Sequence, residues 1–498
     1  MNLMMLLEMA TSGFGDRVAV RNGSEELTYA ELFQAAGAAS AEISASGSEY
    51  MVMLDVSSLA LPVALFASAW AGVPFVPLNY RLADEELEAL LAQVEPAFVV
   101  AGDERGAALS GSSNRRVTTR EAFLSIRSPT VPEPSWPMDP DQIAALLFTS
   151  GTTGAPKAAV LRHRHLVSYI LGSVEFGSAD EADAGLVSVP PYHIAGIAAV
   201  ASSVYAGRRI VQLASFDARD WLDLASAERV TNAFVVPTML ARIAETLGDA
   251  PADLPHLRSL SYGGGPMPHP VIEKAMGLFP DASFTNAYGL TETSSTIAIL
   301  GPEEHRAAAS SGDPTARRRL ASAGRPLPGI EVQIRGPQGD VLGPEERGEI
   351  YVRGEQVSGE YLGQGSRVDE QGWFPTRDAG SMDAEGYLFL EGRADDVIVR
   401  GGENMSPGEI EAVLLEHEAV TDSAVVGIPD EQWGEAVAAV VVTRPGHSVS
   451  AEELQDWVRA RLRSSRTPQR IEFRHELPYN ETGKLLRRVV RAELTASS

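Results

Sequence analysis

Hydroxyl side chains, glycines and one lysine gather in the segment 146–157, which reads LLFTSGTTGAPK. A chain of phosphates is bound by backbone N–H groups that approach closely, by hydroxyl donors and by a cation within reach. Glycines leave room for that approach because they have no side chain. We therefore predict a phosphate-binding loop, whose candidate residues are Thr149, Ser150, Gly151, Thr152, Thr153, Gly154 and Lys157.

This loop differs from the common P-loop, whose pattern G-x-x-x-x-G-K-[ST] places four residues between the glycines. Here Gly151 and Gly154 are three positions apart, and Ala155 and Pro156 stand before the lysine. On composition alone, a polar surface turn between a strand and a helix is an open alternative. Other segments of the chain favour the phosphate-binding interpretation.

A second candidate segment, NAYGLTET at 286–293, brings an aromatic ring, a hydroxyl and a carboxylate close together in the sequence. Tyr288 can offer its ring to a purine, and Thr291 can offer its hydroxyl to a phosphate. Glu292 supplies a hard oxygen ligand of the kind that Mg²⁺ prefers. A helix cap is the alternative interpretation of this acidic residue, but its position after the phosphate loop favours a metal site.

These motifs resemble those of the adenylate-forming superfamily, which includes acyl-CoA synthetases, the adenylation domains of peptide synthetases and firefly luciferase. The resemblance runs from LTYAEL at Leu27 to Arg488 and is strongest to a bacterial fatty acyl-CoA synthetase. It implies ATP, Mg²⁺ and coenzyme A as ligands. The other segments that carry it are PPYHIAG at 190–196, SYGGGPMP at 261–268, GWFPTRDAG at 372–380, GRADDVIVRGGENMSPGEIE at 392–411 and LPYNETGKLLRR at 477–488.

The resemblance implies which residues bind the nucleotide and the metal. The adenine is expected to lie against the glycine loop of Gly263, Gly264 and Gly265. Asp378 is expected to accept both ribose hydroxyls, and Arg393 to contact ribose or phosphate. Thr149 and Glu292 form the implied metal site. Asn286, Ala287, Tyr288, Gly289 and Thr291 complete the nucleotide-binding set. Arg377 replaces the glycine of the usual T-G-D, so we expect altered backbone geometry there.

The resemblance also implies the catalytic residues and a hinge. Lys484, on a glycine-containing loop, is expected to bridge the incoming carboxylate and the α-phosphate and to neutralise the charge that builds there. Glu292 and His193 complete the implied catalytic set. Asp395 is the implied pivot, and Gly401 and Gly402 are expected to face the active site only in the second half-reaction.

The acid pocket is implied by family position and consists of uncharged residues. His193 is expected beside the carboxylate and the thiol path, with an ordinary buried histidine as the alternative. No acidic residue of this set could pair with an amino group, so an amino-acid substrate is disfavoured and a fatty or other apolar acid fits best. The six candidates are His193, Ile194, Phe234, Val235, Tyr262 and Ala287.

We therefore predict an ATP-dependent acid–CoA ligase. It would activate a carboxylic acid as acyl-AMP with release of pyrophosphate and then transfer the acyl group to coenzyme A. One alternative is an adenylating enzyme that loads a carrier-protein phosphopantetheine. Another is a non-catalytic nucleotide-binding relative, which the joint presence of Lys157, Glu292, Asp378, Arg393 and Lys484 disfavours.

Composition narrows the classes of partner. The 498 residues include 41 basic and 67 acidic side chains, and the net charge of −26 opposes non-specific binding to nucleic acid. There is no cysteine, so disulfides and a covalent cysteine intermediate are excluded. The apolar start MNLMMLLEMA lacks the basic region of a signal peptide, and no run reaches the ~18 apolar residues of a membrane span. We expect a cytoplasmic protein with small-molecule partners and allow for a homodimer.

The candidate residues need elements that position them. Short apolar runs such as 50–55 and 97–102 alternate with alanine-rich amphipathic stretches, which predicts a doubly wound sheet with helices on both faces. A similar pattern continues over 186–266. Shorter alternating strands from Ile330 onward predict a small β subdomain. The expected fold is mixed α/β, with a large N-terminal domain (1–394) of two doubly wound α/β subdomains plus this β subdomain, and a small mobile α+β C-terminal domain (395–498).

Overall fold

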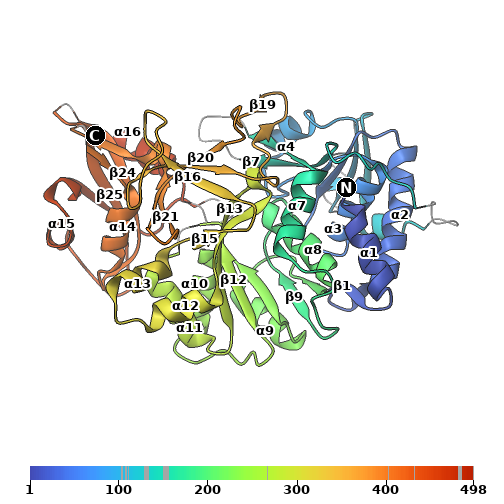
Figure 1. Ribbon diagram of the computed structural model, residues 1–498, viewed down its shortest axis with the longest axis horizontal. Helices are drawn as coiled ribbons and strands as arrows, with labels where there is room; N and C mark the ends of the chain where they lie inside the picture. Colours follow the sequence, from blue (N-terminus) through green and yellow to red (C-terminus); the bar gives the residue numbers. More distant parts are fainter. Residues whose placement is uncertain are drawn as a thin grey trace.

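The computed structural model describes residues 1–102, 105–106, 109, 112–127, 134–149, 156–265, 267–401, 403–430, 432–479 and 485–496, with the backbone alone for Asp395 and Asn404. The N-terminal elements lie at one end of the molecule and the C-terminal elements at the other (Figure 1). The middle of the chain lies between them. None of the helices in these ranges combines the length and the apolar character that crossing a membrane requires.

The first sheet carries both ends of the predicted phosphate loop and has the strand order β19–β18–β8–β7–β4–β3–β5–β6. The strands β3 to β7 run parallel to their neighbours, whereas β8 turns back antiparallel to β7. Its members are β3 (Tyr50–Leu54), β4 (Phe75–Pro77), β5 (Ala97–Ala101), β6 (Arg115–Thr119), β7 (Ile143–Thr149), β8 (Lys157–Arg162), β18 (Glu360–Tyr361) and β19 (Gly365–Ser366). The strand β18 pairs with β8, although it comes much later in the chain.

The second sheet has the order β15–β14–β13–β12–β11–β9–β10–β1–β2 and is parallel from β13 to β1. Its members are β1 (Val18–Asn22), β2 (Glu25–Thr28), β9 (Ala184–Val187), β10 (Arg209–Gln212), β11 (Asn232–Val235), β12 (Ser259–Gly263), β13 (Ser283–Leu290), β14 (Ser295–Leu300) and β15 (Arg325–Pro326). Ligands of such sheets bind beyond the carboxyl ends of the parallel strands. The segments that follow β11, β12 and β13 are therefore well placed for a site.

One hydrophobic core joins the two sheets and the helices between them. The helix α2 packs against α3, and α1 packs against α8. A capping box fixes the start of α2, because the Thr28 hydroxyl accepts the Glu31 N–H. The helices of this region are α1 (Met4–Phe14), α2 (Tyr29–Ala45), α3 (Ala60–Ala71), α4 (Asp84–Leu91), α6 (Arg120–Leu124), α7 (His163–Ser173), α8 (Ile194–Ala206), α9 (Ala218–Ala227), α10 (Pro237–Leu247), α11 (His269–Leu278), α12 (Pro302–Ser310) and α13 (Pro314–Arg318).

Two smaller sheets complete the fold. The first is antiparallel in the order β16–β17–β20–β21, with β16 (Glu331–Arg335), β17 (Gly348–Arg353), β20 (Phe374–Met382) and β21 (Leu388–Arg393). The second has the order β23–β22–β25–β24, with β26 added to β25, and comprises β22 (Ile398–Arg400), β23 (Glu403–Met405), β24 (Val420–Asp430), β25 (Gly434–Thr443) and β26 (Arg470–Arg474). The C-terminal helices are α14 (Pro407–Leu415), α15 (Ala451–Arg459) and α16 (Arg487–Ala496). The mixed α/β class is confirmed, and the boundary near Asp395 stays a prediction.

Candidate active site

The strands on either side of the predicted phosphate loop form the antiparallel pair β7–β8. Thr149 and Lys157 face each other at the end of this pair, and the Thr149 hydroxyl donates to the Lys157 carbonyl oxygen over 3.3 Å. The Lys157 Nζ lies 6.0 Å from the centroid of the Tyr361 ring. The two described ends of the loop therefore meet beside Tyr361. The rest of the predicted loop lies outside the described residues, namely Ser150, Gly151, Thr152, Thr153 and Gly154.

Glu292, the predicted metal ligand, lies with Thr291 in the 3₁₀ helix η1 (Thr291–Thr293) that follows β13. The Tyr361 hydroxyl donates to Glu292 Oε1 over 2.5 Å. Burial, and then the negative charge of Glu292, raises the pKa of Tyr361, so its hydroxyl stays protonated and donates. Tyr361 thus connects Glu292 with the strand of Lys157. The carboxylate keeps further lone pairs that a metal ion or water could share.

Asp378, Arg393 and Tyr288 form a hydrogen-bonded cluster. Asp378 and Arg393 are paired across the strands β20 and β21, and Arg393 Nη1 lies 2.9 Å from Asp378 Oδ1. The Tyr288 hydroxyl donates to Asp378 Oδ2 over 2.7 Å, and burial together with the Asp378 charge raises the Tyr288 pKa. Both oxygens of Asp378 retain acceptor capacity. The geometry is compatible with the predicted binding of two ribose hydroxyls.

Arg377, which stands in place of a glycine beside Asp378, has a left-handed backbone with a φ of +60°. Its N–H donates to Glu349 Oε1 over 3.2 Å. A left-handed conformation is open to glycine but unfavourable for a residue with a Cβ atom. The arginine therefore occupies a glycine-type conformation directly beside Asp378.

The glycine loop after β12 lies against β13. A Cβ atom on Gly263 would come within 2.1 Å of the Ala287 carbonyl oxygen, so the two strands can approach only because this residue is glycine. Gly264 has a φ of +82°. Asn286 Nδ2 donates to the Ser322 carbonyl oxygen over 2.9 Å. The predicted residues of this region that line the neighbouring cleft are Gly264, Gly265, Asn286, Ala287, Tyr288 and Gly289.

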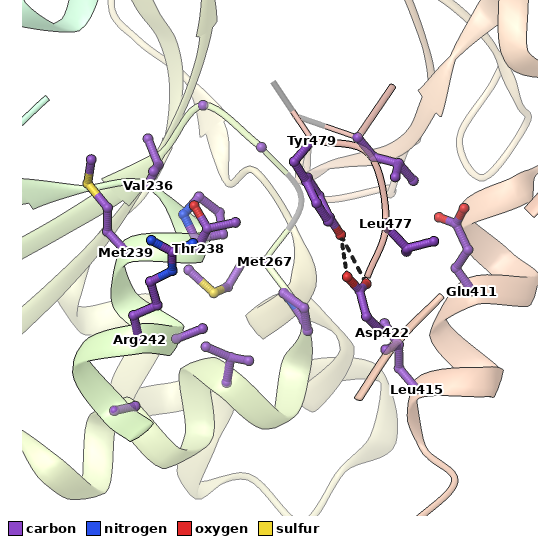
Figure 2. A pocket seen from close by; sticks show the side chains of 18 of the residues that line it. Val236, Thr238, Met239, Arg242, Met267, Glu411, Leu415, Asp422, Leu477 and Tyr479 are labelled. Atoms are coloured by element: carbon purple, nitrogen blue, oxygen red, sulfur yellow. Dashed lines mark hydrogen bonds between the residues drawn. The ribbon is translucent and has the colours of Figure 1, made fainter. Parts of the chain in front are cut away.

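Together with Asp378 and Arg393, these residues line a cleft of about 1690 Å³, whose two walls come from distant parts of the chain (Figure 2). One wall consists of the start of α10 and the loop before α11, with Val236, Thr238, Met239, Arg242 and Met267. The facing wall comes from the C-terminal elements, with Glu411, Leu415, Asp422, Leu477 and Tyr479. The size of the cleft is sufficient for a nucleotide together with a second ligand.

The predicted catalytic lysine, Lys484, lies outside the described residues. Tyr479 and Leu485, which stand on either side of it in the described chain, pair with each other in an antiparallel bridge. Both line the cleft. The Tyr479 hydroxyl donates to the two carboxylate oxygens of Asp422 over 3.0 and 2.8 Å (Figure 2).

The six residues predicted for the acid pocket do not all lie on this cleft. Ala287 lines it. Val235 and Tyr262 are fully buried core side chains, and the Tyr262 hydroxyl lies 2.9 Å from His305 Nε2. Phe234 and Ile194 are half-buried against the core. Val235 and Tyr262 lie on the buried face of β11 and β12, whose residues alternate between half-buried and buried.

His193, the sixth residue, precedes the first turn of α8. Its ring centroid lies 4.7 Å from that of Tyr192. Burial lowers the pKa of His193 to about 4, so the imidazole is neutral near pH 7. Its buried Nε2 has no hydrogen-bond partner among the described residues. A buried polar atom without a partner is costly, so this nitrogen is suited to a ligand.

The hinge residues are described in part. Asp395 lies in the short helix η3 (Ala394–Asp396), where its backbone alone is described, and Gly402 lies outside the described residues. Gly401 forms the turn between β22 and β23 with a φ of +58°. Its N–H donates to the Trp433 carbonyl oxygen over 2.8 Å, and a Cβ atom would meet the indole ring at 2.9 Å.

Three residues of the site were missed by sequence reasoning. Tyr361 lies in a strand of two residues, which is too short for a periodic pattern. Met239 and Met267 line the cleft but look like ordinary core residues in the sequence. A signal for Met239 does exist, because Pro237 predicts a helix start at the carboxyl end of β11.

The comparison with protein families identifies the class. A family model described as "AMP-binding enzyme" matches residues 7–362, and one described as "AMP-binding enzyme C-terminal domain" matches residues 409–484. The chain therefore belongs to the AMP-binding enzyme family. The predicted membership of the adenylate-forming superfamily is confirmed, as is the predicted enzyme class, an AMP-forming acid–thiol ligase.

Individual relatives extend over nearly the whole chain. A feruloyl-CoA synthase from Amycolatopsis sp. is 34% identical over 488 residues, which cover 95% of either chain. A 2-succinylbenzoate–CoA ligase from Geobacillus sp. is 34% identical over 481 residues, which cover 95% of this chain and 94% of that one. The o-succinylbenzoate CoA synthetase of Bacillus subtilis, solved with its acyl-adenylate intermediate, has a TM-score of 0.84 at 30% identity over 98% of this chain and 97% of that one. The expected fold of a large N-terminal and a small C-terminal domain is confirmed.

Proposed function

We propose that this protein activates an apolar carboxylic acid as an acyl-adenylate and transfers the acyl group to coenzyme A. One observation carries the proposal. Within the single segment 288–292, Tyr288 bonds the Asp378–Arg393 pair and Glu292 bonds Tyr361 beside Lys157. A nucleotide whose ribose lies at Asp378 would extend its phosphates along this segment toward Glu292 and Lys157.

The residues present fit ATP and Mg²⁺. Protein sites usually hold Mg²⁺ through one or two carboxylates, and phosphate oxygens of the substrate supply further ligands. Glu292 offers one carboxylate, with one of its oxygens already held by Tyr361. Thr149 and Lys157 offer a hydroxyl and a cation on the neighbouring strands. When bound, the metal neutralises charge on the phosphates.

In the proposed first step, a carboxylate oxygen of the acid attacks the α-phosphorus of ATP and pyrophosphate leaves. Lys157 faces the leaving group, and Lys484 stabilises the charge at the α-phosphate. In the second step, the thiol of coenzyme A attacks the acyl carbon and loses its proton, and AMP leaves. Between the steps, residues 395–498 turn about Asp395 and bring Gly401 to the site.

The proposed acid class follows from the cleft wall. Val236, Met239 and Met267 present apolar side chains to the cleft, and methionines adapt to flat or irregular groups. The two curated relatives act, by their names, on acids that contain an aromatic ring. We therefore place an aromatic acid before a straight-chain fatty acid as the substrate.

The test is a panel of acids in two assays, acid-dependent ATP–pyrophosphate exchange and consumption of free coenzyme A. Because the protein has no cysteine, a thiol reagent reports coenzyme A alone. We expect kcat/KM for an aromatic acid such as cinnamate to exceed that for phenylalanine by roughly 100-fold, since a charged amino group finds no partner in an apolar pocket. Exchange without thiol consumption would favour a carrier-protein acceptor. Absence of exchange with every acid would contradict the proposal.

A further inference from the structure

A short segment, residues 356–361, ties the helix of Glu292 to the strand of Lys157. We call it the clasp. Gln356 Nε2 donates to the carbonyl oxygens of Thr293 and Thr296 over 3.0 and 2.8 Å. The N–H groups of Ser358 and Gly359 donate to the Glu292 carbonyl oxygen over 2.8 and 3.2 Å. The clasp thereby holds the backbone at Glu292 and at the residues that follow it.

The other side of the clasp is fixed to β8. Tyr361 pairs with Ala159 in the antiparallel register of β18 and β8, and the Ser358 hydroxyl bonds the Val160 carbonyl oxygen. Ala159 is two residues beyond Lys157. The clasp is therefore a bridge, built from hydrogen bonds to backbone carbonyl oxygens and from the pairing of β18 with β8, between a predicted metal ligand and a predicted phosphate ligand.

Tyr361, the last residue of the clasp, contacts the carboxylate of Glu292 directly. Its side chain is 9% exposed, and its hydroxyl donates over 2.5 Å to Glu292 Oε1. A carboxylate that binds a metal ion needs a fixed orientation, which a hydrogen-bonded neighbour supplies. We propose that Tyr361 is a positioning residue that orients the Glu292 carboxylate for Mg²⁺. This inference rests on the proposed function, because it takes Glu292 as the metal ligand of an ATP site.

A purely structural role for the ring is the competing explanation. The Tyr361 ring lies 6.0 Å from Lys157 Nζ and 5.1 Å from the Arg367 guanidinium carbon, so it also packs beside two cations. Tyr361→Phe separates the two explanations, because phenylalanine keeps the ring and its contacts and removes the hydroxyl alone. Tyr351→Phe is the matched control, since Tyr351 lies on β17 with its ring against Arg335 at 4.3 Å.

The experiment is calorimetric titration of the whole protein with ATP, once with excess Mg²⁺ and once with EDTA. We expect Tyr361→Phe to weaken MgATP binding about 10-fold and to raise the Mg²⁺ concentration needed for half-maximal binding by a similar factor. Binding of metal-free ATP should stay within about twofold of the unaltered protein, since no carboxylate–metal bond is involved. Tyr351→Phe should change neither value.

A double-mutant cycle gives a second measurement that does not depend on the stability of one variant. Glu292→Gln removes the charged metal ligand and keeps an acceptor for the Tyr361 hydroxyl. In that background we expect Tyr361→Phe to have no further effect on nucleotide binding, because its action passes through the carboxylate. A full additional loss would overturn the inference.

The remaining outcomes are equally decisive. Equal weakening of ATP binding with and without Mg²⁺ would assign Tyr361 a structural or phosphate-side role, and no change would remove it from the site. Absence of Mg²⁺-dependent ATP binding by the unaltered protein would overturn both this inference and the proposed function. If MgATP binds through Tyr361 but no acid is ligated, the inference stands and the proposed function fails.

Discussion

Arg377 shows at the scale of one residue how the site tolerates an unfavourable conformation. Arg377 has a φ of +60°, and the residues before and after it are both held by hydrogen bonds. The Thr376 hydroxyl donates to the Ile350 carbonyl oxygen over 2.8 Å, and Asp378 bonds Tyr288 and Arg393. Strained backbone persists only where its surroundings enforce it, and it collects at functional sites. We therefore attribute the unfavourable backbone conformation of Arg377 to the hydrogen bonds that hold Thr376 and Asp378 in place.

We predict that Arg377→Gly stabilises the folded protein. The left-handed conformation costs a residue with a Cβ atom about 1–2 kcal/mol, whereas glycine adds conformational entropy to the unfolded chain. The free energy of unfolding should rise by roughly 0.5–1 kcal/mol, measured as a higher midpoint in urea. The matched control is Arg229→Gly, at a φ of 52° away from the cleft, which should gain a similar amount. A lower midpoint for Arg377→Gly alone would show that its side chain stabilises the fold.

Sequence motifs suggested candidate residues of the site but not their hydrogen-bond partners. Glu292, Asp378 and Arg393 lie in motifs whose spacing is visible along the chain. Tyr361 is 69 positions from Glu292, and its hydrogen bond depends on the pairing of β18 with β8. Tyr288 was expected to offer its ring to a purine, and its hydroxyl also bonds Asp378. Such contacts are tertiary, so local pattern cannot specify them.

At the scale of elements, the contact between β12 and β13 decides whether the glycine loop can form. We predict that Gly263→Ala destabilises the protein by about 2 kcal/mol or more, because its Cβ atom would lie 2.1 Å from the Ala287 carbonyl oxygen and must force the strands apart. ATP binding should weaken as well, since Ala287 lines the cleft. Thermal unfolding and ATP titration measure the two effects.

A glycine without such a contact provides the control. Gly277 lies in α11, and a Cβ atom there meets nothing within 4 Å. Gly277→Ala should therefore leave ATP binding unchanged and stabilise the protein by up to about 1 kcal/mol, the usual difference between the two residues inside a helix. If both variants behaved alike, the close approach of β12 and β13 would not be the cause.

The elements themselves were largely predictable, but their grouping was not. Alternation of apolar runs and amphipathic stretches predicts largely parallel sheets that are covered by helices. The described part of the chain contains two such sheets. The N-terminal strand β1, however, pairs with β10, so that Val20 faces Ile210 across a long stretch of chain. Val235 and Tyr262, which were assigned to the acid pocket, are fully buried side chains, and their place in that pocket stays a prediction.

At the scale of the whole molecule, buried neutral histidines connect stability to pH. Burial lowers the pKa of His163 to about 4 and that of His165 to about 3. His163 is 1% exposed, and its Nδ1 accepts the Leu3 N–H over 3.2 Å, which requires an unprotonated nitrogen. His163 thereby ties the start of α7 to the N-terminal segment, whereas His165 Nδ1 accepts the Arg162 N–H over 3.2 Å at the same helix start. Their neutral form is thus part of the fold around α1 and α7.

The sign of the pH effect follows from proton binding by the two states. An unfolded histidine has a pKa of about 6.5, so between pH 6.5 and 4 the unfolded chain binds more protons at His163 than the folded one. The contribution of the neutral residue is complete above pH 6.5 and is lost as the pH falls toward 4. The full loss at this residue, reached below pH 4, should be on the order of 3 kcal/mol.

We predict that His163→Asn makes stability less sensitive to acid. The asparagine oxygen can accept the Leu3 N–H but does not titrate, so the decrease in melting temperature between pH 7 and 4.5 should be smaller than in the unaltered protein. The variant is expected to be less stable at pH 7, because the smaller side chain leaves a cavity, and the slope with pH is therefore the measurement. His475→Asn, at an exposed position, should keep the original slope. Parallel curves for His163→Asn and the unaltered protein would show that His163 does not contribute to the acid sensitivity of this chain.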